Sequence, residues 1–192
     1  MNELIEHFQS KLTLSKEAEQ FLRSIATEHT VSKGKVLIRE GQKNDKIFFI
    51  ASGCLRSYCT NKNGKEHTLQ FGIKDWWISD YIALHENTVA QLSVECIKNA
   101  KVIELKRNDL KIFREQFPAF QAYQIRNLER LAVSLQKRIL NQLQLSASER
   151  YDLFLKTYPN IEQDIANYHL ASFLGIAQES LSRIRLKRIK EK

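Results

Sequence analysis

Residues 167–186 read NYHLASFLGIAQESLSRIRL, and this stretch decides the fold at the C-terminal end of the chain. Two helices joined by a tight turn need a small residue where they cross and a glycine where the turn requires positive φ. Ala171 and Gly175 stand at these two positions. Apolar residues follow at the helical steps that point into a shared core, namely Leu170, Leu174, Ile176, Leu181 and Ile184. The seven positions together favour a helix-turn-helix over an ordinary helical hairpin, which is the alternative.

The second helix of this motif is expected to begin near Ala177, and its outward side chains suit the edges of DNA bases. Glutamine can bond to adenine, glutamate can accept from the cytosine amino group, and arginine can fork onto guanine. The expected base-reading residues are Gln178, Glu179, Ser182 and Arg183. The expected phosphate contacts, which position a protein without reading sequence, are Arg185, Lys187, Arg188 and Lys190. The alternative is a merely solvated helix face. His169, in the first helix, is expected to be partly exposed.

The charge of the chain agrees with a polyanionic partner. The 192 residues carry a formal net charge of +8, and the final stretch RIRLKRIKEK, Arg183 to Lys192, holds six basic residues against one acid. The alternative is a solvated terminus. No run approaches the roughly 18 consecutive apolar residues of a membrane span, and Met1 to Ser10 does not resemble a secretion signal. We therefore expect a cytoplasmic protein with no membrane partner, whose three cysteines are reduced.

A long helix is predicted upstream of the motif, over residues 119–144. Its narrow apolar stripe has helical spacing and comprises Ile125, Leu128, Leu131, Leu135, Ile139 and Leu143. The stripe is either packed on its own domain or is a homodimer seam, for which we select Leu128, Leu131, Leu135 and Ile139. Asn108 or Asp109 is expected to cap a shorter helix that ends before Pro118.

Residues 31–105 have the texture of a small β-sandwich or barrel, with short apolar runs between turn signals. Strands are predicted over 36–38, 47–51, 54–60, 66–71, 91–97 and 101–105, with a turn at Ser52-Gly53 and a hairpin turn at Asn63-Gly64. Residues 1–30 are expected to form short amphipathic helices, one of them capped by Ser15.

This order of parts resembles the Crp/Fnr (catabolite-activator) family of bacterial regulators. The stretch GIAQESLSRIRLKRI resembles that family's recognition helix, and EGQKNDKIFFIASGCLRSYCTNKNGKEHTLQF resembles its cyclic-nucleotide-type β-roll. The resemblance implies an α+β fold with an N-terminal β-roll (double-stranded β-helix, jelly-roll-like) sensor domain over 1–107. Connecting and dimerisation helices would follow over 108–145, and a helix-turn-helix domain over 146–192. It also implies a homodimer on a palindromic operator in double-stranded DNA, with RNA polymerase as a further partner.

Two departures from the family pattern affect the expected function. Cyclic-nucleotide-binding members carry a Gly-Glu pair and, ten residues after the Glu, an Arg-Ser pair; here Ser79-Asp80 and Ala90-Gln91 stand in their place. A buried phosphate without a cation is poorly compensated, so the effector is not expected to be cAMP. In addition, relatives carry a β-hairpin wing after the recognition helix. This sequence stops at Lys192, so we expect a truncated domain whose basic tail replaces the wing's phosphate contacts.

The region of the expected sensor cavity is rich in aromatic residues. The candidate effector pocket comprises Trp76, Trp77, Asp80, Tyr81 and Gln91. Three interpretations stay open: a pocket for an unknown small molecule, ordinary core packing, or a collapsed cavity that serves as a scaffold. No nucleophile motif, Gly-rich phosphate loop or metal-ligand spacing is visible, so we expect no catalytic residue, no metal and no cofactor. The alternative function is a small-molecule-binding β-roll with no specific role on DNA.

Overall fold

The N-terminal helices form where the sequence predicts them. The computed structural model describes residues 1–190, and it begins with α1 (Asn2–Gln9) and α2 (Lys16–Ile25). The hydroxyl of Ser15 accepts a hydrogen bond from the backbone N–H of Ala18 at 3.1 Å, which caps α2 as expected. Both helices bury their apolar faces on the outer side of the strands that follow.

Six antiparallel strands make one sheet, built on two long strands, β3 and β6. The strands are β1 (Thr27–Val31), β2 (Val36–Ile38), β3 (Lys46–Thr60), β4 (Glu66–Gly72), β5 (Trp77–Ile78) and β6 (Ser93–Lys106). The order across the sheet is β1-β6-β3-β4, while β2 also pairs with β6 and β5 also pairs with β3. Two expectations were wrong here. Residues 47–51 and 54–60 belong to the single strand β3, and the strands predicted over 91–97 and 101–105 are parts of the single strand β6, which begins only at Ser93.

The bend that replaces a turn in β3 is made by Gly53. The register between β3 and β6 shifts three times between Ile50 and Leu55, and Gly53 adopts φ +87° in this segment. Such bulges bend a strand without ending it. As a result, apolar residues from both halves of each long strand, Phe48, Leu55, Val94 and Val102, fall in one inner core. The sheet therefore folds around itself as the expected β-roll.

The hairpin between β3 and β4 is confirmed, and its loop is held by Asn61. The Asn61 side chain accepts hydrogen bonds from the backbone N–H groups of Asn63 and Lys65, each at 3.0 Å, and Gly64 adopts φ +76°. This is the asparagine chemistry that stabilises turns.

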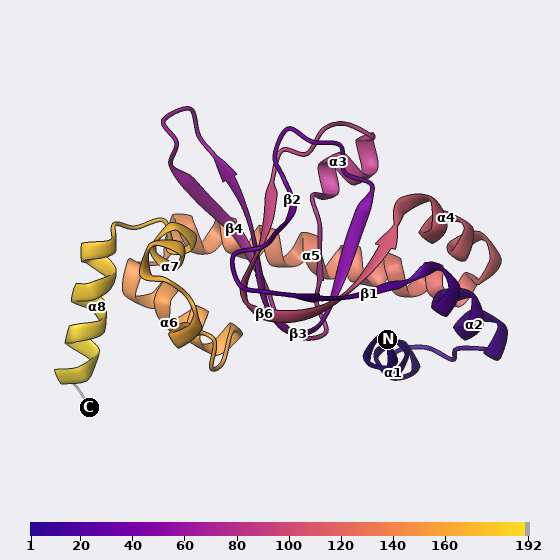
Figure 1. Cartoon of the computed structure of the whole chain (residues 1–192). Helices are drawn as coiled ribbons and strands as arrows, with labels where there is room; N and C mark the ends of the chain where they lie inside the picture. The colour runs from indigo at the N-terminus through magenta and orange to yellow at the C-terminus, as the bar shows by residue number, and fades with distance from the viewer. Residues whose placement is uncertain (191–192) are drawn as a thin grey trace.

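Helices connect the roll to the C-terminal part of the chain (Figure 1). The short α3 (Tyr81–Glu86) lies between β5 and β6, and α4 (Arg107–Gln116) leads into α5 (Pro118–Gln144). The predicted caps of α4 were wrong, because the helix starts at Arg107 and leaves Asn108 and Asp109 inside its first turn. Figure 1 shows α5 running behind the strands, from α4 at one end to α6 at the other.

The C-terminal helices are α6 (Ala147–Thr157), the short 3-10 turn η1 (Glu162–Asp164), α7 (Asn167–Leu174) and α8 (Gln178–Lys190). Ser146 and Glu149 form a reciprocal capping box that starts α6. These helices share a core with the roll, since Phe71 of β4 and Ile97 of β6 pack in the same cluster as Phe154 and Leu170. The expected α+β fold is thus confirmed, with the helical part packed against the sheet.

Candidate nucleic-acid interface

The helix-turn-helix is built by the residues that the sequence selects for it. Gly175 adopts φ +69° between α7 and α8, and the N–H of Ile176 donates to the carbonyl of Ala171 at 3.0 Å. Ala171, Leu170, Leu174 and Leu181 are buried between the helices, whereas Ile176 and Ile184 are half-buried. This core fixes which side of α8 turns outward.

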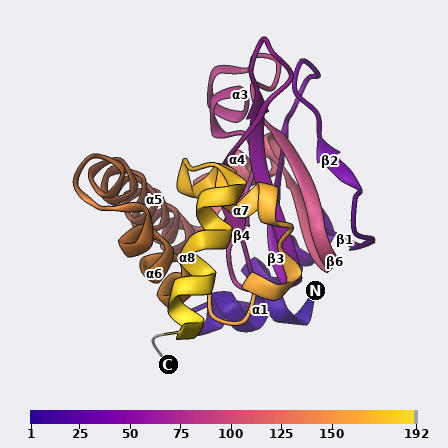
Figure 2. The same cartoon turned by 90° about the vertical axis from the view of Figure 1, so that its left-hand side faces the viewer.

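The first turns of α8 present an exposed polar face. All four expected base-reading side chains, Gln178, Glu179, Ser182 and Arg183, are exposed. The Ser182 hydroxyl donates to the carbonyl of Gln178 at 3.1 Å, and Arg183 donates to the Ser180 hydroxyl at 3.2 Å, so their contacts lie within α8. Figure 2 shows α8 at the outside of the molecule, in front of α7. The face is therefore accessible to a groove of DNA, and the role of each side chain stays a prediction.

The expected phosphate contacts separate into two groups. Lys187 and Lys190 are exposed. Arg185 pairs with Glu162 at 2.8 Å and donates to the Tyr151 hydroxyl at 3.2 Å, and Arg188 pairs with Asp152. These contacts tie α8 to α6 and η1, and the phosphate contacts expected of Arg185 and Arg188 stay a prediction. Glu191 and Lys192 of the basic tail lie outside the described residues.

His169 differs from the expectation of a partly exposed residue. Its side chain is buried, with 5% exposed, and its Nδ1 has no hydrogen-bond partner among the described residues. Burial, assisted by the positive charges of Arg56 and Lys33, lowers the pKa of His169 to about 3. The ring is therefore neutral at physiological pH and packs where α7 meets the roll. The helical spacing alone gave no signal of this burial, which arises from a distant element.

The expected effector residues do not converge on one pocket. Asp80 is fully buried and caps α3. Its two carboxylate oxygens accept four backbone N–H hydrogen bonds of 2.5–3.2 Å, from Ile82, Ala83, Gln91 and Leu92. The acceptor capacity of this carboxylate is therefore used within the chain, and the Gln91 side chain points to solvent. The expectation that Asp80 and Gln91 line a ligand cavity is not supported by this geometry.

The aromatic members of the expected pocket face different cores. Trp77 packs 5.2 Å from Phe49 between ring centroids and donates its indole N–H to the Tyr123 hydroxyl at 2.8 Å. Trp76 packs on Tyr158 of the C-terminal part at 5.6 Å. Tyr81 is half-buried beside the same core as Trp77. Of the three interpretations left open by the sequence, core packing agrees best with these positions.

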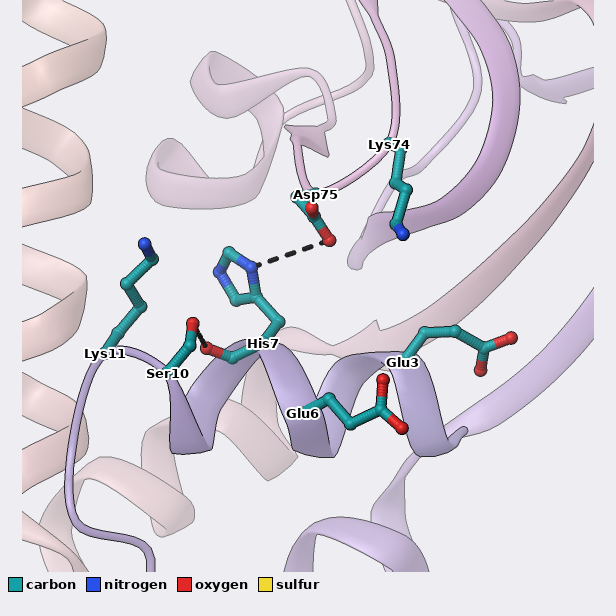
Figure 3. A pocket seen from close by; sticks show the side chains of 7 residues that line it. All are labelled: Glu3, Glu6, His7, Ser10, Lys11, Lys74 and Asp75. Carbon is teal, nitrogen blue, oxygen red and sulfur yellow. Dashed lines mark hydrogen bonds and ion pairs between the residues drawn. The ribbon is translucent and has the colours of Figure 1, made fainter.

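A polar hollow lies between α1 and the loop that joins β4 to β5 (Figure 3). His7 points from α1 toward Asp75, with 3.7 Å between Nδ1 and Oδ1, and its Nε2 lies 2.8 Å from the Tyr123 hydroxyl. Burial lowers the pKa of His7, which keeps this ring neutral at physiological pH. The hollow contains none of the expected effector residues. In the described part of the chain, no group of three metal-ligating side chains could hold a metal ion.

The stripe on α5 is exposed near both ends of the helix, at Ile125 (51%) beside α4 and at Leu143 (77%) beside the helix-turn-helix. Leu135 is 39% and Ile139 62% exposed, whereas Leu128 and Leu131 are half-buried. A shallow hollow beside α4 reaches the stripe at Ile125 and Leu128. Large exposed apolar side chains at helical spacing are unusual on a surface that stays in water, so a partner surface remains the better interpretation.

Sequence reasoning missed the side chains that hold the helix-turn-helix in place. Arg138 and Gln142 of α5 and Arg150 of α6 donate to backbone carbonyls at or before the turn. Polar residues on a helix that also carries an apolar stripe resemble ordinary solvated positions, and no local signal distinguishes them.

Comparisons with known proteins agree with this architecture. Residues 28–117 match the family described as "Cyclic nucleotide-binding domain". The chain is 22% identical over 182 residues to the "Anaerobic regulatory protein" of Bacillus subtilis (strain 168), covering 89% of this chain and 76% of that one. The match therefore extends from the roll into the helix-turn-helix.

Two solved structures show the same fold over most of the chain. FixK2 from Bradyrhizobium japonicum superposes with a TM-score of 0.75 at 17% identity, covering 87% of this chain and 86% of that one. A transcriptional regulator of the Crp/Fnr family from Eubacterium rectale gives a TM-score of 0.71 at 17% identity, covering 92% and 85%. The expected resemblance is confirmed, since the Bacillus relative is a regulatory protein by name and the Eubacterium structure is described as a transcriptional regulator of the Crp/Fnr family. Among residues 1–190, no helix is long and apolar enough to cross a membrane.

Proposed function

We propose that this chain, which resembles Crp/Fnr regulators in sequence and fold, is a sequence-specific DNA-binding transcription regulator that acts as a homodimer. One observation carries the proposal. The first turns of α8 expose Gln178, Glu179, Ser182 and Arg183 while the opposite side of the helix is buried against α7. A helix that is anchored on one side and polar on the other suits the major groove. The partners that this function requires are double-stranded DNA and a second copy of the chain.

Selection from a randomised duplex pool at physiological salt tests the proposal. We expect an inverted repeat whose half-sites lie about one helical turn apart. Weak binding that falls steeply with salt and selects no sequence would contradict the proposal, because a basic surface alone produces such binding.

Single substitutions then test the base-reading face. Arg183→Ala should weaken binding to the selected operator by about 1–3 kcal/mol and relax the preference at one base position. Arg39→Ala is the matched control, since Arg39 is exposed on the roll. Equal effects of the two substitutions would mean that α8 does not read bases.

The homodimer is proposed from the exposed stripe on α5. Ile139→Glu places a charge on the apolar seam, whereas Gln136→Glu places the same charge on an exposed polar position of the same helix. We expect Ile139→Glu to convert a dimer into a monomer in sedimentation and to abolish operator binding, and Gln136→Glu to leave both unchanged. A dimer that survives Ile139→Glu would place the interface elsewhere.

We also propose that the roll does not take a cyclic nucleotide, although its sequence matches that family. The backbone N–H groups of Gln91 and Leu92 are already bonded to Asp80, and the stretch 76–95 contains no Arg or Lys. A ligand that binds only the folded state raises the melting temperature. Addition of cAMP or cGMP should therefore leave the melting temperature unchanged, and a rise that saturates would overturn this part of the proposal. An effector of another class, and RNA polymerase as a partner, remain compatible with the regulator.

A further inference from the structure

The edge of the sheet at β4 is covered by the helix-turn-helix. In the order β1-β6-β3-β4, strand β4 pairs on one side only. An uncovered edge strand leaves backbone groups unpaired. Here the N–H of Thr68 donates to the Ser172 hydroxyl of α7 at 2.9 Å, and that hydroxyl donates to the carbonyl of Glu66, also at 2.9 Å. Side chains of the helical part thus complete this edge of the roll.

Arg138 of α5 joins the same edge and the same helix. Its guanidinium donates to the carbonyls of Leu69 and Thr68 in β4, the latter at 3.0 Å, and to the carbonyl of Phe173 in α7 at 3.3 Å. It also lies over the Phe173 ring, 4.4 Å from the centroid. One side chain therefore connects the long helix, the sheet edge and the first helix of the motif. We call this group of contacts the α5–α7–β4 junction.

The turn of the motif is held from the same face of α5. Gln142, one helical turn after Arg138, donates to the carbonyl of Leu174 at 3.4 Å, and Arg150 donates to that carbonyl at 3.1 Å. A Cβ at Gly175 would lie 3.1 Å from the Gln142 amide oxygen, so the turn approaches α5 closely. At 100° per residue, the exposed stripe with Leu135 and Ile139 lies beside this face. The residues that position the motif are therefore adjacent to the residues proposed to form the dimer.

We propose that Arg138 is a positioning residue that sets the distance and angle between the two recognition helices of the dimer, and thereby the half-site spacing that the protein accepts. The proposal rests on the DNA-binding function proposed above. The base-reading face of α8 stays exposed while the junction is formed, so the junction is compatible with bound DNA. A rigid connection raises the effective concentration of the second recognition helix at one spacing and lowers it at others.

The first experiment tests the junction without DNA. Hydrogen exchange is measured on the full-length protein and on Arg138→Gln, Arg138→Lys and Ser172→Ala. We expect faster exchange at Thr68 and in α7 in all three variants, with β3 unchanged, because a lysine cannot reproduce a planar donor that bridges several carbonyls. Arg126→Gln, an exposed arginine on the same helix, should exchange like the wild type. Unchanged exchange in both Arg138→Gln and Ser172→Ala would overturn the proposal.

The second experiment measures binding to the selected operator with its half-sites moved together or apart by one and two base pairs. The wild type should prefer the selected spacing by about tenfold or more. Arg138→Gln should bind the selected operator about tenfold more weakly than the wild type does. Its affinities for the operators of different half-site spacing should differ from one another by only a few-fold. A loss of folded protein would weaken binding to every spacing equally, so preserved spacing preference in Arg138→Gln overturns the inference. If the wild type selects no inverted repeat at all, the proposed function itself fails, and that failure is visible before any variant is made.

Discussion

Asp80 illustrates how one side chain can hold two segments together at the residue scale. Its carboxylate caps α3 and also accepts the N–H groups of Gln91 and Leu92 on the way into β6. Family resemblance predicted a ligand-binding role for this position. The structure shows the acceptor turned toward the chain's own backbone.

Replacing Asp80 tests how much this arrangement contributes to stability. Asp80→Ala leaves buried N–H groups without an acceptor, which should lower the free energy of unfolding by about 2–4 kcal/mol. Glu86→Ala, at an exposed position of the same helix, should change it by less than about 0.5 kcal/mol. Urea unfolding measures both. A small effect of Asp80→Ala would mean that water replaces the carboxylate.

His169 gives the protein a stability that depends on pH. The pKa of this ring is about 3 in the folded state because of burial, compared with 6.5 in the unfolded chain. Between these values only the unfolded chain binds the proton, so the free energy of unfolding should fall as the pH decreases from 6.5 toward 3. His169→Gln should flatten this dependence between pH 6.5 and 5. Parallel curves for His169→Gln and the wild type would contradict the assignment.

At the scale of elements, local patterns predicted where structure occurs better than how long each element is. Capped helices, the Asn63-Gly64 hairpin and the helix-turn-helix follow from spacing and turn chemistry over a few residues. The sequence did not predict that β3 and β6 are each one continuous strand. In β3, Ser52-Gly53 has the composition of a turn and was expected to end the strand. Pairing with the partner strand, which lies distant in sequence, allows the chain to bulge there and continue. The full role of Asp80 was missed for the same reason, since two of its four partners, Gln91 and Leu92, lie eleven and twelve residues away.

Gly53 lies at a bend inside a strand, whereas Gly64 lies in an open turn, and the two positions differ in how much space surrounds the backbone. A Cβ at Gly53 would lie 2.4 Å from the carbonyl oxygen of Asn99 and 2.5 Å from Cα of Ala100, whereas nothing lies within 4 Å of one at Gly64. Both residues have positive φ, so alanine strains each backbone by about 1 kcal/mol. Gly53→Ala should lower the free energy of unfolding by about 3 kcal/mol or more, because the backbone atoms of Asn99 and Ala100 must also move to make room for the new Cβ. Thermal unfolding compares the two, and similar melting temperatures would show that the bulge is adaptable.

For the whole molecule, the shared core between roll and helix-turn-helix predicts cooperative unfolding. Phe71 of β4 is fully buried, and its ring centroid lies 5.1 Å from that of Phe173 and 5.9 Å from that of Phe154. We expect one calorimetric transition for the wild type. Phe71→Ala should lower the free energy of unfolding by about 3–5 kcal/mol. It should also split the single calorimetric transition into two.

The equally buried Phe8 is the matched control for this prediction, because it packs with Trp77 and Phe120 in a separate core that contains no residue of the helix-turn-helix. Phe8→Ala should lower the melting temperature without dividing the transition. If both substitutions split the transition, or if neither does, the result would argue against a shared core that couples the roll to the helix-turn-helix.

The neighbouring tryptophans make the two sides of the molecule optically distinguishable. Trp77 is buried beside Phe49 with its indole N–H bonded to Tyr123, whereas Trp76 is half-buried against Tyr158 of the C-terminal part. A protein that retains only Trp77 emits from the core that α1 and α5 form against the outer side of the roll. A protein that retains only Trp76 emits from the boundary with the helix-turn-helix. Two single phenylalanine replacements thus convert the natural fluorescence into separate reporters, one for the packing of α1 and α5 on the roll and one for the docking of the C-terminal helices, with no attached dye.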